Sequence, residues 1–172
     1  MELIDLYDEK TGKKNGQVID KDIAHRDGLW HKSVHILVFS KDKKRMLLQR
    51  RSLNKSLGPG RWDITVGGHV GTGEESIDAA KRELSEELGL NLKINYLKTI
   101  KEVFQINNID SREFVDIYVS YEDIDLSKIV LQEEEVMDVN WFTLDEVEEM
   151  IKDKRLLQHH EEFSIIRDIM CQ

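Results

Sequence analysis

The chain has 172 residues and a formal net charge of −9, with 40% hydrophobic and 34% charged residues. This size predicts one domain covering residues 1–172, and the composition is typical of a soluble globular protein. Because an acidic chain repels a phosphate backbone, we expect no DNA or RNA polymer as a partner. The single cysteine, Cys171, excludes a disulfide within the chain and fits a reducing cytosol.

The apolar runs are short. One of the longest, residues 36–39, is far too short to span a bilayer. Residues 1–5 lack the basic and apolar regions of a signal peptide. We therefore expect a cytoplasmic protein without a membrane partner.

The first part of the chain indicates mainly strands. A short strand is expected over residues 3–7, followed by a turn cluster at 11–16. Apolar runs predict strands over 33–40 and 45–49, which the turn at 41–44 would join as a hairpin. After a loop at 52–61, a short strand over 62–66 leads into a glycine-rich bend.

From Glu75 the pattern becomes helical, and Gly89 supplies a stop signal. The apolar positions of this helix share one face: Ile77, Ala80, Leu84 and Leu88. Further strands are expected over 92–103, 113–121 and 136–142, and two amphipathic helical segments over 144–152 and 159–170. This order indicates an α+β fold in which helices cover a sheet.

The first predicted helix carries an acidic cluster. At about 100° per residue, Glu83, Glu86 and Glu87 lie in one narrow sector beside the apolar stripe. Each like-charged pair costs roughly 0.2–0.5 kcal/mol, and the helix dipole disfavours anions near the C-terminal end. Mg²⁺ would remove the conflict because it binds carboxylate and phosphate oxygens. On helix geometry alone, a solvated acidic face is the alternative.

The residues around this cluster form a motif. Gly68, five residues, Glu74, seven residues and then Arg82-Glu83-Leu84-x-Glu86-Glu87-x-Gly89-Leu90 resembles the complete Nudix box. The resemblance implies a Nudix fold, which is an α/β/α sandwich around a mixed β-sheet. It also implies hydrolysis of a diphosphate linkage with Mg²⁺ or Mn²⁺ as the cofactor.

The resemblance assigns roles to residues of the box. Glu83, Glu86, Glu87 and the carbonyl of Gly68 would bind the metal, and Arg82 would pair with Glu74 to hold the helix. Glu86 is the first choice for the base that takes the proton of the attacking water. In this family a different loop often supplies the base, which makes the acidic run 133–135, and Glu135 in particular, a second candidate. Such runs are more often solvated surface.

Residues 34–51, 62–68 and 135–141 resemble the isopentenyl-diphosphate isomerase branch of the superfamily. That branch binds a metal through histidines and glutamates outside the box, and four residues fall near those places here: His25, His31, His69 and Glu113. Gly67 stands where the isomerases carry their catalytic cysteine. Without that thiol, proton transfer to an alkene loses its main acid–base group.

We therefore predict Mg²⁺-dependent hydrolysis of a small-molecule diphosphate, in particular a nucleoside diphosphate derivative. Arg50, Arg51 and His69 are candidate substrate-binding residues, although strand alternation allows only one of the two arginines to face the site. His35 is predicted to be an ordinary polar residue of a strand. The alternatives are an isopentenyl-diphosphate isomerase and a non-catalytic Nudix domain that senses a ligand. A homodimer is expected.

Overall fold

The computed structural model describes residues 1–172 and has a mixed seven-stranded sheet at its centre. Five strands follow the order β5-β4-β3-β8-β7, while β6 pairs with β3 and β9 pairs with β4. In chain order the elements are β1 (Leu3–Tyr7), β2 (Lys14–Asp20), α1 (Lys21–Asp27), β3 (Trp30–Phe39), β4 (Arg45–Arg51), β5 (Trp62–Asp63), β6 (Val66–His69), α2 (Ser76–Leu88), β7 (Asn95–Ile106), β8 (Ile109–Tyr121), the 3₁₀ turn η1 (Leu126–Lys128), β9 (Val136–Thr143), α3 (Leu144–Lys152) and α4 (His160–Met170).

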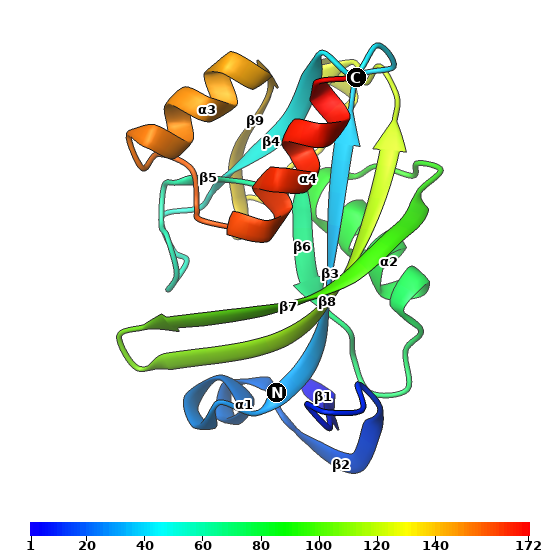
Figure 1. Ribbon diagram of the computed structural model, residues 1–172, viewed down its shortest axis with the longest axis vertical. Coiled ribbons are helices and arrows are strands. Elements are labelled where there is room, and N and C mark those ends of the chain that lie inside the picture. Colours follow the sequence, from blue (N-terminus) through cyan, green and yellow to red (C-terminus); the bar gives the residue numbers. More distant parts are fainter.

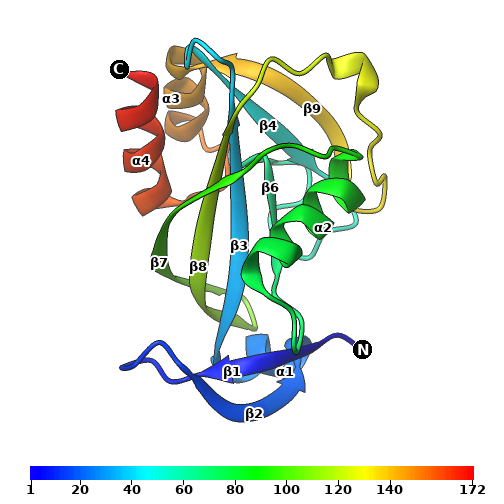
Figure 2. The same cartoon turned by 90° about the vertical axis from the view of Figure 1, so that its right-hand side faces the viewer.

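Helices cover both faces of this sheet (Figures 1 and 2). Helices α3 and α4 lie on one face and α2 lies on the other, which confirms the predicted α/β/α sandwich. Strand β3 contributes to the core on both faces of the sheet, because its successive side chains point to opposite faces. Leu37 and Phe39 pack in the core under α3 and α4, whereas Ile36 and Val38 pack in the core under α2. No helix is long and apolar enough to cross a membrane.

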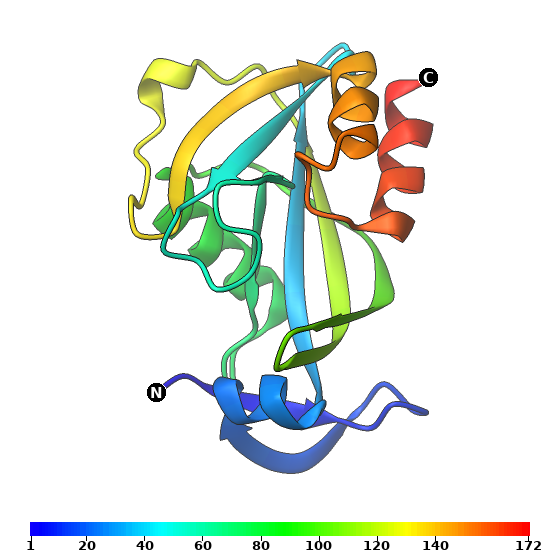
Figure 3. The same cartoon turned by 90° about the vertical axis from the view of Figure 1, so that its left-hand side faces the viewer.

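The predicted hairpin between residues 33–40 and 45–49 exists but is short. Only Val38 with Leu47 and Phe39 with Met46 pair between β3 and β4, because β6 occupies the same edge of β3 from Ser33 to Ile36. Strand β4 diverges from β3 at this point and pairs along its other edge with β9, the orange strand that arches over β4 in Figure 3.

The predicted single strand over 62–66 is wrong, because it divides into β5 and β6. Strand β5 pairs with β4, whereas β6 pairs with β3. Thr65 lies at the division. Its hydroxyl accepts a hydrogen bond from the Val38 amide at 3.0 Å and donates one to the Leu47 carbonyl, so it bridges the two diverging strands.

Strands β7 and β8 form a longer hairpin than the predicted strands over 92–103 and 113–121. They pair from Asn95 with Val119 as far as Ile106 with Ile109. Asn107 takes a positive φ of 55° in the two-residue turn, a conformation that asparagine tolerates better than most residues. The polar residues near the tip hid this extension from the sequence pattern, although both strands are continuous there.

A small N-terminal unit lies across one end of the sheet (Figure 2). It consists of the antiparallel pair β1–β2 and helix α1, around a core of Ile4, Leu6 and Ala24. The side chain of Asp20 caps α1 by accepting from the Asp22 amide at 2.9 Å. Neither β2 nor α1 was predicted from the sequence, because their apolar residues are few and the predicted turn at 11–16 overlaps the start of β2 at Lys14.

Candidate active site

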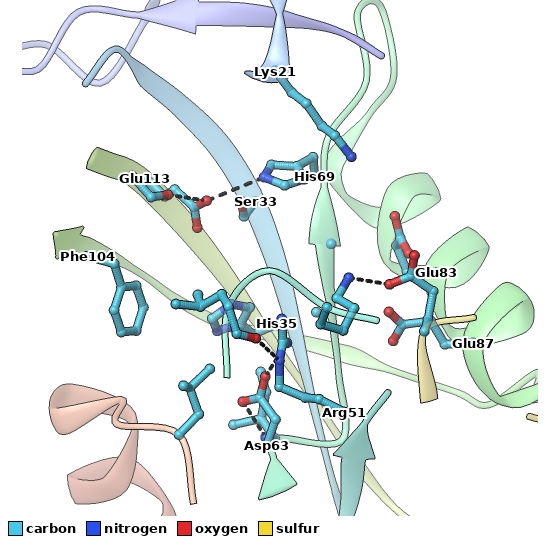
Figure 4. A pocket seen from close by; sticks show the side chains of 18 of the residues that line it. Lys21, Ser33, His35, Arg51, Asp63, His69, Glu83, Glu87, Phe104 and Glu113 are labelled. Atoms are coloured by element: carbon cyan, nitrogen blue, oxygen red, sulfur yellow. Dashed lines mark hydrogen bonds and ion pairs between the residues drawn. The ribbon is translucent and has the colours of Figure 1, made fainter. Parts of the chain in front are cut away.

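A cavity of about 450 Å³ opens between the sheet, helix α2 and the N-terminal unit. Three groups of polar side chains surround it in Figure 4: Glu83 and Glu87 on one side, His69 and Glu113 on a second, and His35, Arg51 and Asp63 on a third. Only five of the lining residues are hydrophobic, namely Leu57, Ile64, Phe104, Ile109 and Leu157. The cavity is therefore suited to a polar or charged ligand.

The three box glutamates of α2 lie in different environments. Glu87 is buried, Glu83 is partly buried, and Glu86 exposes about half of its side chain (48%). Burial raises the pKa of Glu83 to about 7, although Arg82 opposes it, and raises that of Glu87 to about 8 with the help of the Glu83 charge. Two carboxylates that resist ionisation beside a polar cavity fit a site for a cation.

Gly68 lets Glu83 approach strand β6. A Cβ atom at position 68 would lie 2.2 Å from Cδ and 2.4 Å from Oε1 of Glu83, which is far inside contact distance. The glycine predicted as a metal ligand therefore sits directly against a predicted ligand carboxylate. Its missing side chain is required by this close approach.

Arg82 connects the box helix to the glycine-rich bend. Its Nε and Nη2 donate to the two carboxylate oxygens of Glu74 at 2.8 and 3.0 Å, and Nη2 also donates to the His69 carbonyl at 3.1 Å. Its Nη1 lies 2.9 Å from Glu83 Oε1 and 3.3 Å from Glu86 Oε2. The predicted pair of Arg82 and Glu74 is present, and the same guanidinium also orients two of the acidic side chains.

A second cluster joins residues that the sequence analysis compared with the metal-binding residues of isomerases. The ligand atoms of His25, His31, His69 and Glu113 all lie within 4.8 Å of one another. His25 Nε2 lies 3.1 Å from His69 Nε2, and His31 Nε2 lies 3.1 Å from Glu113 Oε1. Helix α1 and strands β3, β6 and β8 each supply one of these residues. The donor set is suited to a divalent metal ion.

The other predicted site residues are divided between the cavity and its surroundings. Arg51 lines the cavity and donates from Nη1 to Asp63 Oδ2 at 2.9 Å, whereas Arg50 does not line it and donates from Nε to the Gly60 carbonyl at 2.9 Å. Glu135 lines the cavity and forms an ion pair with Lys55. Glu133 and Glu134 are not among the lining residues. Of the two arginines, only Arg51 is therefore placed to contact a ligand in the cavity.

The third group of side chains was not predicted from the sequence. In this group His35 pairs with Glu162, and His159 contacts Asp63 and Glu102. The prediction that His35 is an ordinary polar residue did not anticipate these contacts. These residues come from β3, β5, β7 and the start of α4, so no local motif joins them. The one signal was a histidine inside the apolar run of β3, where a buried polar side chain needs partners.

The family profile described as NUDIX domain matches residues 29–164. The chain belongs to the Nudix family. This Nudix chain is 36% identical over 148 residues to Nudix hydrolase 3 of Arabidopsis thaliana, a match that covers 80% of this chain but 19% of the plant protein. It is 32% identical over 161 residues to an uncharacterised Nudix hydrolase of Clostridium acetobutylicum, covering 89% of this chain and 75% of that protein. These relatives confirm the predicted enzyme class, a Nudix hydrolase.

Among solved structures, DR0079 from Deinococcus radiodurans superposes with a TM-score of 0.71 at 24% identity, covering 98% of this chain and 99% of that one. At this identity the likeness establishes the fold alone. It extends over the whole chain, including the N-terminal unit that precedes the family match.

Isopentenyl-diphosphate isomerases are also among the relatives. The Delta-isomerase 2 of Aromatoleum aromaticum is 31% identical over 148 residues, covering 84% of this Nudix chain and 72% of that protein. The predicted closeness to this branch agrees with that finding. A Cβ atom at Gly67, the position where the isomerases carry their catalytic cysteine, would lie 3.1 Å from Cδ2 of His35. The His35 imidazole therefore occupies the space beside Gly67.

Proposed function

We propose that this Nudix protein hydrolyses a diphosphate linkage in a small polar molecule with Mg²⁺ or Mn²⁺, and that its substrate is a nucleoside diphosphate derivative. The observation that carries the proposal is the position of Glu83 and Glu87. Helix α2 places both carboxylates at the cavity, and burial keeps their pKa values near or above neutrality, at about 7 and about 8. A divalent cation bound between Glu83 and Glu87 would supply the positive charge that stabilises both carboxylates in their ionised form.

Glu83, Glu86, Glu87 and the Gly68 carbonyl would hold the cation. When bound, it neutralises phosphate oxygens and lowers the pKa of a coordinated water. Two residues of the chain support this arrangement. Arg82 holds Glu83 and Glu86 by ion pairs, and the Gln49 amide donates to Glu87 Oε2 at 3.0 Å, which fixes the orientation of that carboxylate.

Exposure supports the choice of the base. Glu86 is the most exposed of the three box glutamates, so water reaches its carboxylate directly. Glu135 also lines the cavity but is less exposed, with 37% of its side chain accessible against 48% for Glu86. Glu86 therefore stays our first choice for accepting the water proton and Glu135 the second.

The lining of the cavity supports the substrate class. A nucleoside or sugar presents hydroxyls and ring nitrogens that charged and hydrogen-bonding side chains can bind, whereas an isoprenoid tail presents only hydrocarbon. Away from α2 the wall carries Arg51, Asp63 and His35, which favours the polar ligand. Arg51 and His69 are the proposed contacts for the substrate, and Arg50, which does not line the cavity, is not proposed as a contact.

The test is hydrolysis of a panel of diphosphates with MgCl₂, including nucleoside di- and triphosphates, nucleotide sugars, ADP-ribose, diadenosine tetraphosphate and isopentenyl diphosphate. ADP-ribose and diadenosine tetraphosphate are included because proteins of similar fold are named ADP ribose pyrophosphatase and Ap4A hydrolase. We expect Glu86→Gln and Glu87→Gln each to lower kcat at least about 100-fold. Glu75→Gln, which changes an exposed neighbour at the start of α2, is the matched control. Equal rates in all variants would refute the assignment, and tight nucleotide binding without turnover would indicate a ligand-sensing domain.

Isomerisation of isopentenyl diphosphate is the second candidate, and the cluster of His25, His31, His69 and Glu113 is the observation that favours it. Gly67 argues against it because this position offers no thiol. The test is incubation of isopentenyl diphosphate in deuterated water. Deuterium in recovered dimethylallyl diphosphate would establish the isomerase, and its absence would exclude it.

A further inference from the structure

Four residues of the third group converge on one point. His35 lies on β3, Glu102 on β7, His159 immediately before α4 and Glu162 in its first turn. Their ligand atoms all lie within 4.8 Å of one another. His35 Nδ1 is 2.5 Å from Glu162 Oε1, and His159 Nδ1 is 3.1 Å from Glu102 Oε2. Segments far apart in the sequence thus bring two imidazoles and two carboxylates together.

The hydrogen bonds in this group do not satisfy its acceptors. His159 Nδ1 carries at most one proton, yet it faces Glu102 Oε1 at 3.2 Å, Glu102 Oε2 at 3.1 Å and Glu162 Oε2 at 3.3 Å. Glu162 is fully buried, and its Oε2 atom has no hydrogen-bond partner. A buried carboxylate oxygen without a donor is destabilising. This oxygen lies 3.3 Å from His159 Nδ1, so a cation bound beside the two residues would contact it.

The charges of the group lead to the same conclusion. Asp63, Glu102 and Glu162 are acidic, and Arg51 contributes one positive charge through its ion pair with Asp63. These three carboxylates exceed the single positive charge of Arg51 by two, a difference that two protonated imidazoles would balance. A divalent cation beside two neutral imidazoles provides the same total charge and also reaches the unsatisfied oxygen.

The surroundings of His159 resemble those of metal-binding histidines. Its Nε2 lies 2.7 Å from Asp63 Oδ1, while Nδ1 faces the two glutamates. A histidine that ligates a metal usually donates its other ring N–H to a carboxylate, which fixes the tautomer and the ring orientation. Arg51 holds Asp63 in turn at 2.9 Å. Two imidazoles and two carboxylates suit Zn²⁺, or a similar transition metal ion, better than Mg²⁺.

We propose that His35, Glu102, His159 and Glu162 form a binding site for a transition metal ion, separate from the box carboxylates and from the cluster at Glu113. His35, Glu102 and His159 also line the cavity. A metal ion held there would place positive charge at the cavity wall that lies away from α2, close to the part of the substrate that reaches this wall. This consequence rests on the proposed function, whereas the metal site itself does not.

The first experiment locates the ion directly. Wild-type crystals grown with ZnCl₂ are measured on both sides of the zinc absorption edge, and we expect an anomalous difference peak between His35, His159 and Glu162. Peaks confined to the other two clusters would overturn the proposal. This measurement needs no variant, so it remains decisive if a substitution prevents folding.

The second experiment counts bound ions in solution. After dialysis against limiting zinc, Glu162→Gln is expected to retain one zinc ion per chain fewer than the wild type by mass spectrometry. The matched control is Glu161→Gln, which changes the exposed neighbour and should retain the wild-type number. Unchanged zinc in both Glu162→Gln and His35→Asn would contradict the site. Hydrolysis with MgCl₂ is a separate readout, so failure of this site and failure of the proposed function are distinguishable.

Discussion

Individual glutamates carry most of the chemistry proposed for this protein. Burial and neighbouring charges give these glutamates different pKa values. Glu87 is buried with a pKa raised to about 8, while Glu86, one position earlier, exposes about half of its side chain. Glu74 is held by Arg82 through two hydrogen bonds, and that contact lowers its pKa. Under the proposed function, the same residue type would thus serve as a buried ligand, an exposed base and a structural anion within one motif.

Glu74→Gln should destabilise the fold in a pH-dependent way. Arg82 lowers the pKa of Glu74 from its ordinary value of 4.5 in the folded protein. A lowered folded-state pKa gives stability that is present above about pH 4.5 and lost as the pH falls through the folded pKa. We expect the variant to lose about 1 kcal/mol at pH 7 and the difference from wild type to shrink below pH 4.5.

Urea unfolding at pH 7 and at pH 3.5 measures this effect. Glu9→Gln, at an exposed turn position, is the control and should leave the unfolding free energy unchanged at both pH values. A pH-independent difference between Glu74→Gln and wild type would show that lost packing, rather than the ion pair, is responsible.

At the scale of elements, the contact between β6 and α2 sets the geometry of the box. Gly68 lies on β6 directly against Glu83, and Arg82 ties α2 to the bend that follows β6. The position of the glutamates therefore depends on how closely the strand and the helix approach.

Gly68→Ala should reduce activity more than stability. The added Cβ would lie 2.2 Å from Glu83 Cδ, so the carboxylate must move. A displacement of about 1 Å at a reacting group can cost about 100-fold in rate, whereas overpacking costs about 1–3 kcal/mol. We expect kcat to fall by at least about tenfold while the circular dichroism spectrum is kept.

Gly71→Ala is the control for this variant. Its added Cβ would meet Glu74 Oε2 at 3.4 Å, an ordinary contact, and Gly71 does not have a positive φ. We expect near wild-type kcat. Equal loss in both variants would mean that flexibility of the bend, rather than the position of Glu83, determines activity.

The elements that could be predicted from sequence are those with strong local signals. Helix α2 ends at Gly89 with a φ of 65°, and its apolar face packs in the core as the spacing of Ala80, Leu84 and Leu88 predicts. The box residues were found because they lie within one helix and its preceding loop. Helix α1 was missed because its apolar residues are few, and the division of residues 62–69 into β5 and β6 was missed because it depends on pairing with different strands. The group around His35 and Glu162 was missed for the same reason, because 127 positions separate these two residues.

At the scale of the whole molecule, three acidic or histidine-containing groups surround one cavity in a chain with a net charge of −9. Mutual repulsion of these charges opposes the compact state in the absence of cations. Bound cations should therefore stabilise the native protein, because the unfolded chain does not assemble the sites. Dimerisation and location in the cytoplasm remain predictions of the sequence.

Magnesium should raise the melting temperature. A ligand that binds only the native state at 100 times its Kd contributes about 2.7 kcal/mol, and each kcal/mol shifts Tm by about 2–4 °C for a chain of this size. We expect a rise of several degrees with MgCl₂, measured by differential scanning calorimetry. The double variant Glu83→Gln, Glu87→Gln should lose most of this rise. NaCl at the same ionic strength is the control, and an equal rise with NaCl would indicate screening of charge instead of a binding site.

The N-terminal unit has a consequence for how this enzyme can diversify. The family match begins at residue 29, yet Glu2, Lys21 and His25 reach the cavity from earlier in the chain. The hydrolytic motif and part of the ligand-facing wall therefore come from two different parts of the chain. Exchange of residues 1–28 between relatives would vary one wall while keeping the sequence of the box, although it would also replace Leu3 and Asp5, which accept hydrogen bonds from the amides of Thr72 and Gly73 in the box loop. Chimeras of this kind offer a route to altered ligand preference with an unchanged catalytic motif.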